Sequence, residues 1–402
     1  MGSDHLDTLI AQGNLAVVLE NLGSYEEALK MEQEVYEKRK KLLIEDHPDI
    51  FLAQNNLAMT LCKLGRYEEA LKMEQEVYEK RKKVLGEKHP DTIAAQGSLA
   101  SVLIKLGRYE EALNMLREAY GKTKEVLGED YPDTIPIGTM IVITLEKLGR
   151  YEEALEMEQE VYEKRKKIQG EDHLDTIEEQ NNVAISLENL DHDKKALEMF
   201  REVYEKRKKV QGEDHLDTIE AQNNVAISLE NLGHDKKALR VFREVYEKRK
   251  KVQGEDHLST LATQHKIAIL LRHLGNYEEA LAVFNEVLEK MKIVLTDDHP
   301  DTLRVQNNKA IALVYFGQYE EALKIFRKVY KKRKAVLTDD HPDTLKTRYD
   351  MANVLIYLGQ YEKALNIARE IYKKSREVLG PDHPDTLATQ KLIAFILRHL
   401  AH

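Results

Sequence analysis

The feature that most constrains this chain is a period of 42 residues that runs through all of it. Residues 173–214 and 215–256 differ at only four positions. Histidine marks the start of nearly every unit, and tyrosine takes its place once. The units start near His5, His47, His89, Tyr131, His173, His215, His257, His299 and His341, and a half unit follows at 383–402. A fixed period of this length indicates stacked supersecondary elements, each of which buries its apolar face against its neighbours.

Each unit predicts two antiparallel helices separated by a glycine. In the second unit, Leu57 and Leu61 recur at helical spacing before Gly65, and such a glycine ends a helix readily. A second helix starts near Tyr67, carries acidic residues in its first turn and ends in basic residues before Gly86. Acidic residues at the start of a helix and basic residues at its end both interact favourably with the helix dipole. The sequence therefore predicts an all-α chain that is more than three quarters helical.

Two places in the chain depart from this regularity. In the fourth unit, Pro136 and Gly138 stand where other units carry helix-forming residues, so the first helix there is predicted to start late or to kink. The half unit at 383–402 is predicted to form one helix that covers the last repeat. Ile393, Phe395 and Leu397 make this helix apolar on more than one side, which predicts either a truncated boundary or a surface for self-association.

Composition and charge exclude several classes of protein. Cys62 is the only cysteine, so an intrachain disulfide or a cysteine-based metal site is excluded. The net charge of −10 argues against general nucleic-acid binding. No apolar run approaches the roughly 20 residues of a membrane span, and no secretory signal opens the chain. We therefore expect a cytoplasmic protein that contacts neither membrane nor nucleic acid.

The recurring histidines invite a metal hypothesis, but helix spacing argues against it. Equivalent histidines belong to packed helices roughly 8–10 Å apart, whereas a Zn–N bond is about 2 Å long. A structural role, in which each histidine caps the first helix or packs in the turn, is predicted instead. The sequence also lacks a Ser/His/Asp or Cys/His constellation beside its many glutamates. No enzyme activity, cofactor, metal or small-molecule substrate is therefore expected.

Small residues complete a recognisable pattern. Ala58, Gly65, Tyr67 and Ala70 recur in register, and a small apolar residue follows at Val77. The pattern resembles the tetratricopeptide repeat, whose usual unit has about 34 residues. With "QNNLA", "LGRYEEAL" and "HPDT", this longer form resembles the repeats of kinesin light chain and of some nucleotide-dependent signalling proteins. The resemblance implies one right-handed α-solenoid of tandem helix-turn-helix repeats over residues 1–402.

The resemblance also implies that the first helix of each unit lines a concave groove. The first amide of each Asn pair then faces that groove and can bind a peptide backbone; these are Asn55, Asn181, Asn223 and Asn307. The units differ most on the same face, which is acidic in the middle and basic with tyrosines towards the end. The varying groove residues are Glu146, Glu188, Glu230, Arg272, Arg304, Lys346, Tyr349 and Tyr357. The alternatives are amides that bond within or between helices, and variation that reflects drift.

We therefore expect a non-enzymatic scaffold or adaptor that binds a protein or peptide segment in its groove. One alternative is a sensor or oligomerisation module of a larger nucleotide-dependent signalling protein. Another is a consensus-like or designed repeat scaffold without a ligand, which the near-identity of neighbouring units suggests. Binding of an extended peptide by the isolated array distinguishes the first hypothesis from the other two.

Overall fold

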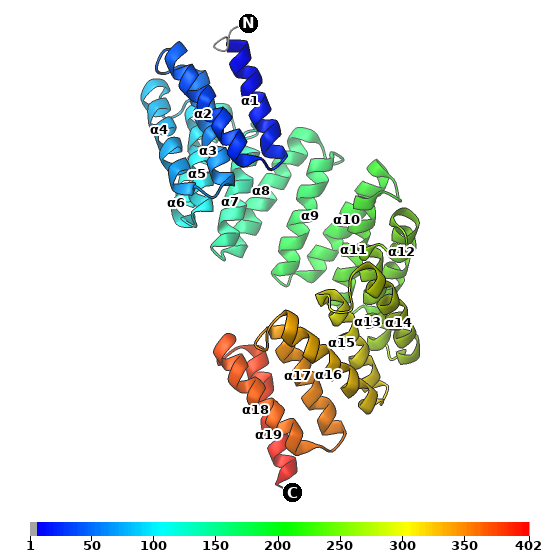
Figure 1. The fold of residues 1–402 in the computed structure, drawn as a ribbon. Coiled ribbons are helices and arrows are strands. Elements are labelled where there is room, and N and C mark those ends of the chain that lie inside the picture. The colour runs from blue at the N-terminus through cyan, green and yellow to red at the C-terminus, as the bar shows by residue number, and fades with distance from the viewer. Residues whose placement is uncertain (1–5, 402) are drawn as a thin grey trace. The chain divides into compact units, whose positions relative to one another are not determined.

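The computed structural model describes residues 6–401 as a succession of antiparallel helices joined by short turns (Figure 1). Within these residues there are nineteen helices and no strand, and helices account for 82% of them. The predicted all-α fold of tandem helix pairs is confirmed. The predicted start of the first 42-residue repeat at His5, and the final residue His402, lie outside the described residues.

The chain divides into two compact units, Met1–Ala196 and Leu197–His402, and the boundary falls inside α10. Whether they form the single solenoid predicted for residues 1–402 stays a prediction. The first unit holds α1 (Leu6–Asn21), α2 (Tyr25–Leu42), α3 (Pro48–Lys63), α4 (Tyr67–Leu85), α5 (Pro90–Lys105), α6 (Tyr109–Leu127), α7 (Thr134–Lys147), α8 (Tyr151–Gln169) and α9 (Leu174–Asn189). Helix α10 (Asp193–Gln211) follows. The second unit holds α11 (Leu216–Asn231), α12 (Asp235–Gln253), α13 (Leu258–His273), α14 (Tyr277–Val294), α15 (Pro300–Tyr315), α16 (Tyr319–Val336), α17 (Pro342–Tyr357), α18 (Tyr361–Val378) and α19 (Pro384–Leu400).

The recurring histidines cap the first helices of the repeats, as predicted. The Nδ1 atom of His47 accepts a hydrogen bond from the backbone N–H of Asp49 at 3.2 Å, which satisfies one of the unpaired donors of the first turn. The same cap is made by His47, His89, His173, His215, His257, His299, His341 and His383. The histidine column is therefore part of the framework.

The glycine between the two helices of a repeat is needed for its backbone conformation. Gly65 has a φ of 74°, in the left-handed region that favours glycine. Asp191 occupies the equivalent place in the fifth repeat and adopts the same conformation, with a φ of 59°. An aspartate pays a steric cost in this region that glycine does not.

Helix α7 starts late, which confirms the prediction for the fourth 42-residue repeat. It begins at Thr134, two residues after the place where Pro48 and Pro90 open their helices. Pro136 is then its third residue, where a backbone N–H has no partner within the helix. Gly138 is buried, and a Cβ atom added to it would lie 2.6 Å from Val161 Cγ2 in α8. The glycine thus permits a close approach of α7 and α8.

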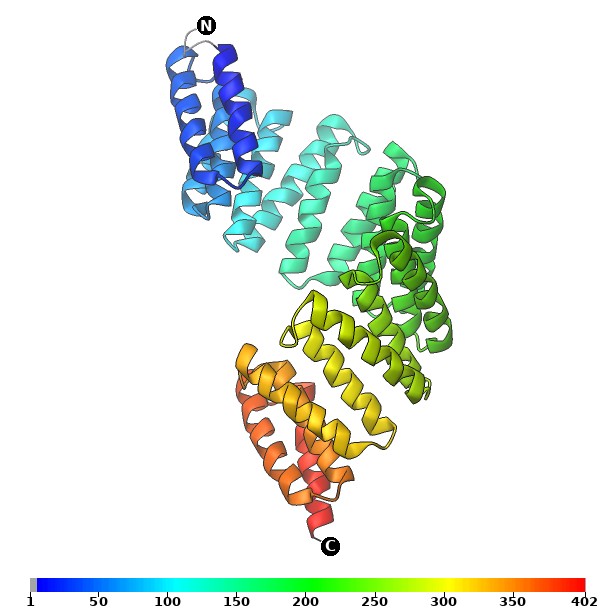
Figure 2. The same cartoon turned by 45° about the vertical axis from the view of Figure 1, so that its right-hand side comes forward.

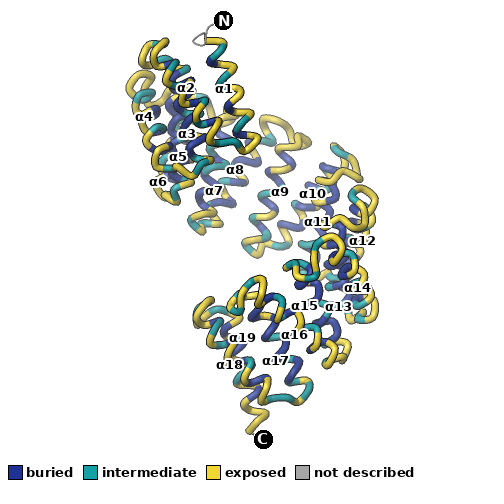
Figure 3. The backbone as a smooth tube through the Cα atoms, in the orientation of Figure 1, coloured by how far each residue is buried: buried dark blue, intermediate teal, exposed yellow. Residues whose placement is uncertain are grey.

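Each unit is built from two layers of helices, which both views display (Figures 1 and 2). Within a compact unit, each helix packs against the next one in sequence. Among helices that are two apart in sequence, the most extensive contacts join odd-numbered helices, such as α3 with α5 and α15 with α17. The odd-numbered layer is therefore the more tightly spaced, inner layer of each unit. Buried residues follow the helix faces that meet (Figure 3). Fully buried alanines such as Ala58, Ala100 and Ala310 let the helices approach closely.

Helix α19 is the single C-terminal helix that the sequence predicted. It packs against α18, and Leu392 and Ile396 are buried in the core of the second unit. Phe395 and Leu397 remain more than 40% exposed. Self-association through this face stays a prediction. None of the helices within residues 6–401 combines the length and apolar character that a membrane span requires.

Candidate functional site

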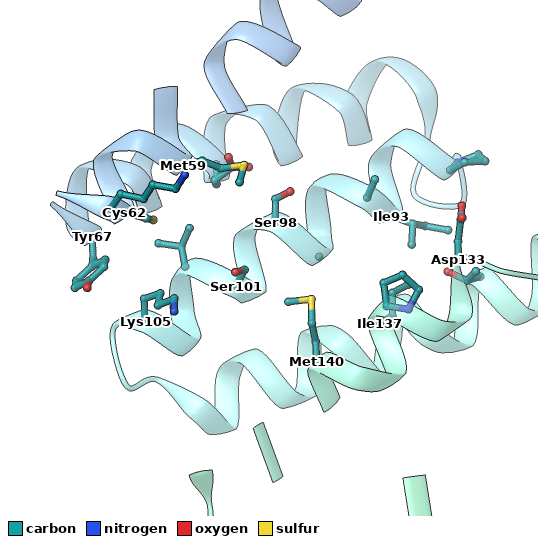
Figure 4. A pocket seen from close by; sticks show the side chains of 18 of the residues that line it. Met59, Cys62, Tyr67, Ile93, Ser98, Ser101, Lys105, Asp133, Ile137 and Met140 are labelled. Atoms are coloured by element: carbon teal, nitrogen blue, oxygen red, sulfur yellow. The ribbon is translucent and has the colours of Figure 1, made fainter. Parts of the chain in front are cut away.

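A trough of about 780 Å³ lies in the first unit, along α3, α5 and α7 (Figure 4). Its volume is typical of pockets that bind ligands, which measure about 300–1,000 Å³. We call it the α5 trough, because α5 runs along its floor.

The floor of the α5 trough consists of small residues on one face of α5. They are spaced i, i+3, i+4 and i+7, which places them on one side of a helix: Ala94, Gly97, Ser98 and Ser101. The equivalent positions carry larger side chains in the neighbouring inner helices, with Leu52, Asn55, Asn56 and Met59 in α3 and Pro136, Thr139, Met140 and Ile143 in α7. The hollow therefore results from the small residues of a single repeat.

The walls of the α5 trough are apolar and its ends are polar. Figure 4 shows Met59 and Cys62 of α3 on one side and Ile137 and Met140 of α7 on the other. Tyr67 and Lys105 lie at one end, and Asp133 lies at the other. Lys63, also at the rim, is ion-paired with Glu20 at 3.0 Å.

Glu74 of α4 contributes a buried carboxyl group to the α5 trough. Its side chain is 1% exposed, and its Oε2 atom makes no hydrogen bond with any described residue. Burial raises the pKa of Glu74 to about 8, although the positive charge of Arg81 acts in the opposite direction. A buried polar atom without a partner is uncommon in folded proteins.

Comparison among the repeats shows how unusual Glu74 is. In the fifth to eighth repeats the same position of the second helix is a fully buried phenylalanine: Phe200, Phe242, Phe284 and Phe326. Two other repeats carry a buried glutamate there, and each meets a hydroxyl from the first helix of the next repeat. Thr60 donates to Glu32, and Ser186 bonds to Glu158. For Glu74 the equivalent residue is Val102, which cannot donate a hydrogen bond.

A smaller hollow of about 240 Å³ lies between α1 and α3, and α1 belongs to the repeat two before that of α5. Ile10, Gly13, Asn14 and Val17 line it, at the same four helix positions as the floor of the α5 trough. The inner face of the first unit is thus hollowed at two places.

The predicted groove asparagines lie on inner helices but differ in their surroundings. Asn55 and Asn181 are half-buried, and the Nδ2 atom of Asn55 lies 3.8 Å from Met59 Sδ. Asn223 is buried and donates to Glu220 at 3.4 Å. Asn307 is also buried, and its amide bonds to residues of the next inner helix. The alternative that these amides bond within or between helices thus describes Asn223 and Asn307.

The predicted charged and aromatic groove residues also lie on inner helices. Glu146, Arg304, Lys346 and Tyr357 are exposed, and Glu188, Glu230, Arg272 and Tyr349 are half-buried. Several contact neighbouring repeats: Glu230 pairs with Lys266 at 2.9 Å, Arg272 lies over the Tyr315 ring at 5.6 Å, and Tyr357 stacks on Tyr319 at 5.1 Å. Arg304 pairs with Asp301 at 2.8 Å within its own helix.

The α5 trough itself was missed by the sequence prediction, since none of the predicted groove residues lines it. The signal lay in the four small residues at 94, 97, 98 and 101. No three histidine, cysteine, aspartate or glutamate side chains within residues 6–401 gather closely enough to hold a metal ion.

Solved structures with similar folds cover much or all of the chain. The apo form of RapI covers 98% of this chain and 98% of its own length, at 16% identity and a TM-score of 0.58. A tetratricopeptide repeat protein from Parabacteroides merdae covers 76% of this chain and 98% of its own, at 16% identity and a TM-score of 0.53. Putative kinesin light chain repeats from Podosopora anserina cover 52% and 99%, at 23% identity and a TM-score of 0.46.

Sequence comparison assigns the family. No curated protein matches the chain. Two family models, both described as tetratricopeptide repeat, do match it. One covers residues 8–49, and the other covers 49–125, 139–209, 180–251, 217–293, 259–335, 301–376 and 343–402. Since these matches span nearly the whole chain, the protein belongs to the tetratricopeptide repeat family.

Proposed function

We propose that this chain is a non-enzymatic scaffold that binds an extended segment of a partner protein along its inner helices. The observation that carries the proposal is the α5 trough, an apolar hollow with polar ends on the inner layer of the first unit. A concave, mostly apolar surface with a few polar groups is typical of a binding site.

The dimensions of the trough suit an extended segment. Packed helices lie roughly 8–10 Å apart, so a path from α3 across α5 to α7 is about 20 Å long. An extended chain advances about 3.3 Å per residue, and about six residues therefore cover this path. Side chains of such a segment alternate in direction, so every second one enters the trough.

The proposal gives the predicted groove residues unequal roles. Glu146 belongs to α7, which lines the trough, and we infer that its charge helps to orient a bound segment. Glu188 of α9, and Arg304 and Lys346 of the second compact unit, lie beyond the path from α3 to α7 and stay separate predictions. Asn223 and Asn307 already bond within the protein, so they contribute less to binding than the sequence suggested. Complementary charge chiefly speeds encounter and sets polarity, and the association is expected to weaken with added salt.

Selection of random peptides displayed on phage against the purified chain tests the proposal. Ser101→Phe fills the floor of the trough at an exposed position and is expected to weaken the selected peptides at least tenfold. Asn114→Phe, at an exposed position of the outer helix α6, is the matched control and is expected to leave affinity unchanged. If both variants bind the peptides like the parent chain, the trough is not the binding surface. A cytoplasmic location and self-association through α19 remain separate predictions.

A further inference from the structure

The α5 trough contains one buried group whose interactions are incomplete. Glu74 is closed off from solvent, lines the trough and has an unbonded Oε2 atom. Its two glutamate counterparts, Glu32 and Glu158, are each supplied with a hydroxyl by the next repeat, whereas Glu74 meets Val102 there. The Oε2 atom of Glu158 is also without a partner, but Glu158 still bonds to Ser186, so among the three glutamates only Glu74 lacks a hydroxyl donor from the next repeat.

Several polar groups that line the α5 trough can accept a hydrogen bond or attract a cation. Besides Glu74 they include the hydroxyls of Ser98 and Ser101, the ring of Tyr67 and the carboxylate of Asp133. A hydroxyl can accept as well as donate, and an aromatic face attracts cations.

The lysines of the α5 trough are poorly placed to bind an anion. Lys63 and Lys105 are both exposed at the rim, and Lys63 is already paired with Glu20 at 3.0 Å. An anion in the trough would therefore meet no buried cation, while a donor would meet Glu74.

The apolar walls restrict the shape of the occupant. Met59, Cys62, Ile137 and Met140 line the two sides of the trough, so a strongly hydrated ion gains little there. A long apolar stem that ends in a charged donor suits both the walls and Glu74, in the way that lysine and arginine stems cover apolar surface.

Charge decides between an ammonium group and a neutral donor. A hydrogen bond between two ionised groups is roughly twice as strong as one between neutral groups. Because burial raises the pKa of Glu74 to about 8, forming its carboxylate at pH 7 costs about a factor of ten in a binding constant. The ion pair must offset this cost together with the dehydration of the ammonium group, and burial of the apolar stem against the trough walls contributes the rest of the binding free energy.

We propose that the α5 trough is a site for a basic group on an apolar stem, a lysine-type ammonium, which pairs with the buried carboxylate of Glu74. The inference rests on the proposed function, because it names the side chain that a bound partner segment places in the trough.

Dansylcadaverine is a suitable probe, since it joins a fluorescent apolar ring system to a primary ammonium through five methylene groups. Its analogue with a terminal hydroxyl has the same body without the charge. Fluorescence titration of the full chain at pH 7 is expected to show at least tenfold tighter binding of the ammonium probe.

Three variants connect this preference to Glu74. Glu74→Gln keeps the shape but not the charge, and it is expected to abolish the preference for the ammonium probe. Val102→Ser supplies the hydroxyl that Glu32 and Glu158 already have, and it is expected to weaken the ammonium probe severalfold. Glu158→Gln removes a buried glutamate outside the trough and is expected to leave the preference for the ammonium probe unchanged. Far-UV circular dichroism verifies that each variant is folded.

The outcomes distinguish this inference from the proposed function. Equal binding of both probes, or an unchanged preference in folded Glu74→Gln, overturns the cation site. If the affinity of the selected peptides is still reduced by Ser101→Phe, the proposed peptide-binding function stands without the cation site. If no peptide is selected while the ammonium probe depends on Glu74, the site stands and the peptide-binding function falls.

Discussion

Asn307 donates its side-chain N–H to the carboxylate of Asp350 at 3.1 Å, which joins helices α15 and α17 of successive repeats. The same amide accepts a hydrogen bond from Thr347 at 3.1 Å, and Thr347 also accepts from Arg333 at 2.7 Å. An asparagine on the inner face of the second unit is thus part of a network between repeats.

The first prediction concerns this network. Asn307→Ala is expected to destabilise the protein by about 1–3 kcal/mol, because buried partners lose their hydrogen bonds. Asn55→Ala is the control, because within the described residues the only hydrogen-bond partner of the Asn55 amide is the sulfur atom of Met59 at 3.8 Å. The free energy of unfolding is expected to change by no more than about 0.5 kcal/mol in this variant. Urea unfolding followed by circular dichroism measures both. Equal effects of the two changes would contradict a special role of Asn307.

The second prediction concerns pH. Burial raises the pKa of Glu74 from its ordinary value of 4.5 to about 8, so the folded state holds this proton more tightly than the unfolded state. The stabilisation from Glu74 is complete below about pH 4.5 and is lost as the pH rises through 8. Between pH 5.5 and 8 the loss is on the order of 3 kcal/mol.

Thermal unfolding at a series of pH values tests this prediction. Glu74→Gln cannot ionise, so its Tm is expected to fall less than that of the parent chain between pH 5.5 and 8. Burial also raises the pKa of Glu158, to about 7, so Glu158→Gln is expected to flatten the profile in the same direction but less. Parallel profiles for the parent chain and Glu74→Gln would count against a buried neutral Glu74.

The third prediction concerns Gly138. Because an added Cβ would lie 2.6 Å from Val161 Cγ2, Gly138→Ala is expected to destabilise the protein by about 1–3 kcal/mol. Val161→Ala in the same chain is expected to recover part of this loss. Gly97→Ala is the control, since its Cβ meets nothing within 4 Å and alanine favours a helix by about 1 kcal/mol. Chemical denaturation of the four chains distinguishes a steric effect from helix propensity.

The fourth prediction uses the near-identity of residues 173–214 and 215–256. Asp191 has a φ of 59° where the following repeat has Gly233 with a φ of 71°. Asp191→Gly is expected to stabilise the protein by about 1 kcal/mol, because it removes the steric cost of the left-handed conformation. Gly233→Asp is expected to have the opposite effect. A fall in Tm for Asp191→Gly would show that the aspartate makes a compensating interaction.

The elements of the fold were predictable because their causes are local. The His47 cap, the turn at Gly65 and the late start of α7 near Pro136 each depend on a few consecutive residues. Repetition of these short patterns every 42 residues then identified the helix pairs and their order.

The candidate site was not predicted from the sequence, because its causes act between repeats. Asn307 has the residue type of a groove amide, but its partner Asp350 lies 43 residues away, and sequence reading did not connect the two. The trough exists because the side chains on the inner face of α5 are smaller than those at the equivalent positions of α3 and α7. The buried state of Glu74 was indicated by the phenylalanines at equivalent positions, yet its missing partner became evident only when Val102 was compared with Thr60 and Ser186.

The floor and walls of the α5 trough come from three consecutive repeats, and this arrangement has a mechanical consequence. In a repeat stack each unit is held by its nearest neighbours, so bending is resisted one interface at a time. A segment seated on α5 that touches Met59 on one side and Met140 on the other would link the second repeat directly to the fourth. Such a segment would restrain bending between these repeats, so the stiffness of this part of the stack would depend on whether the trough is filled.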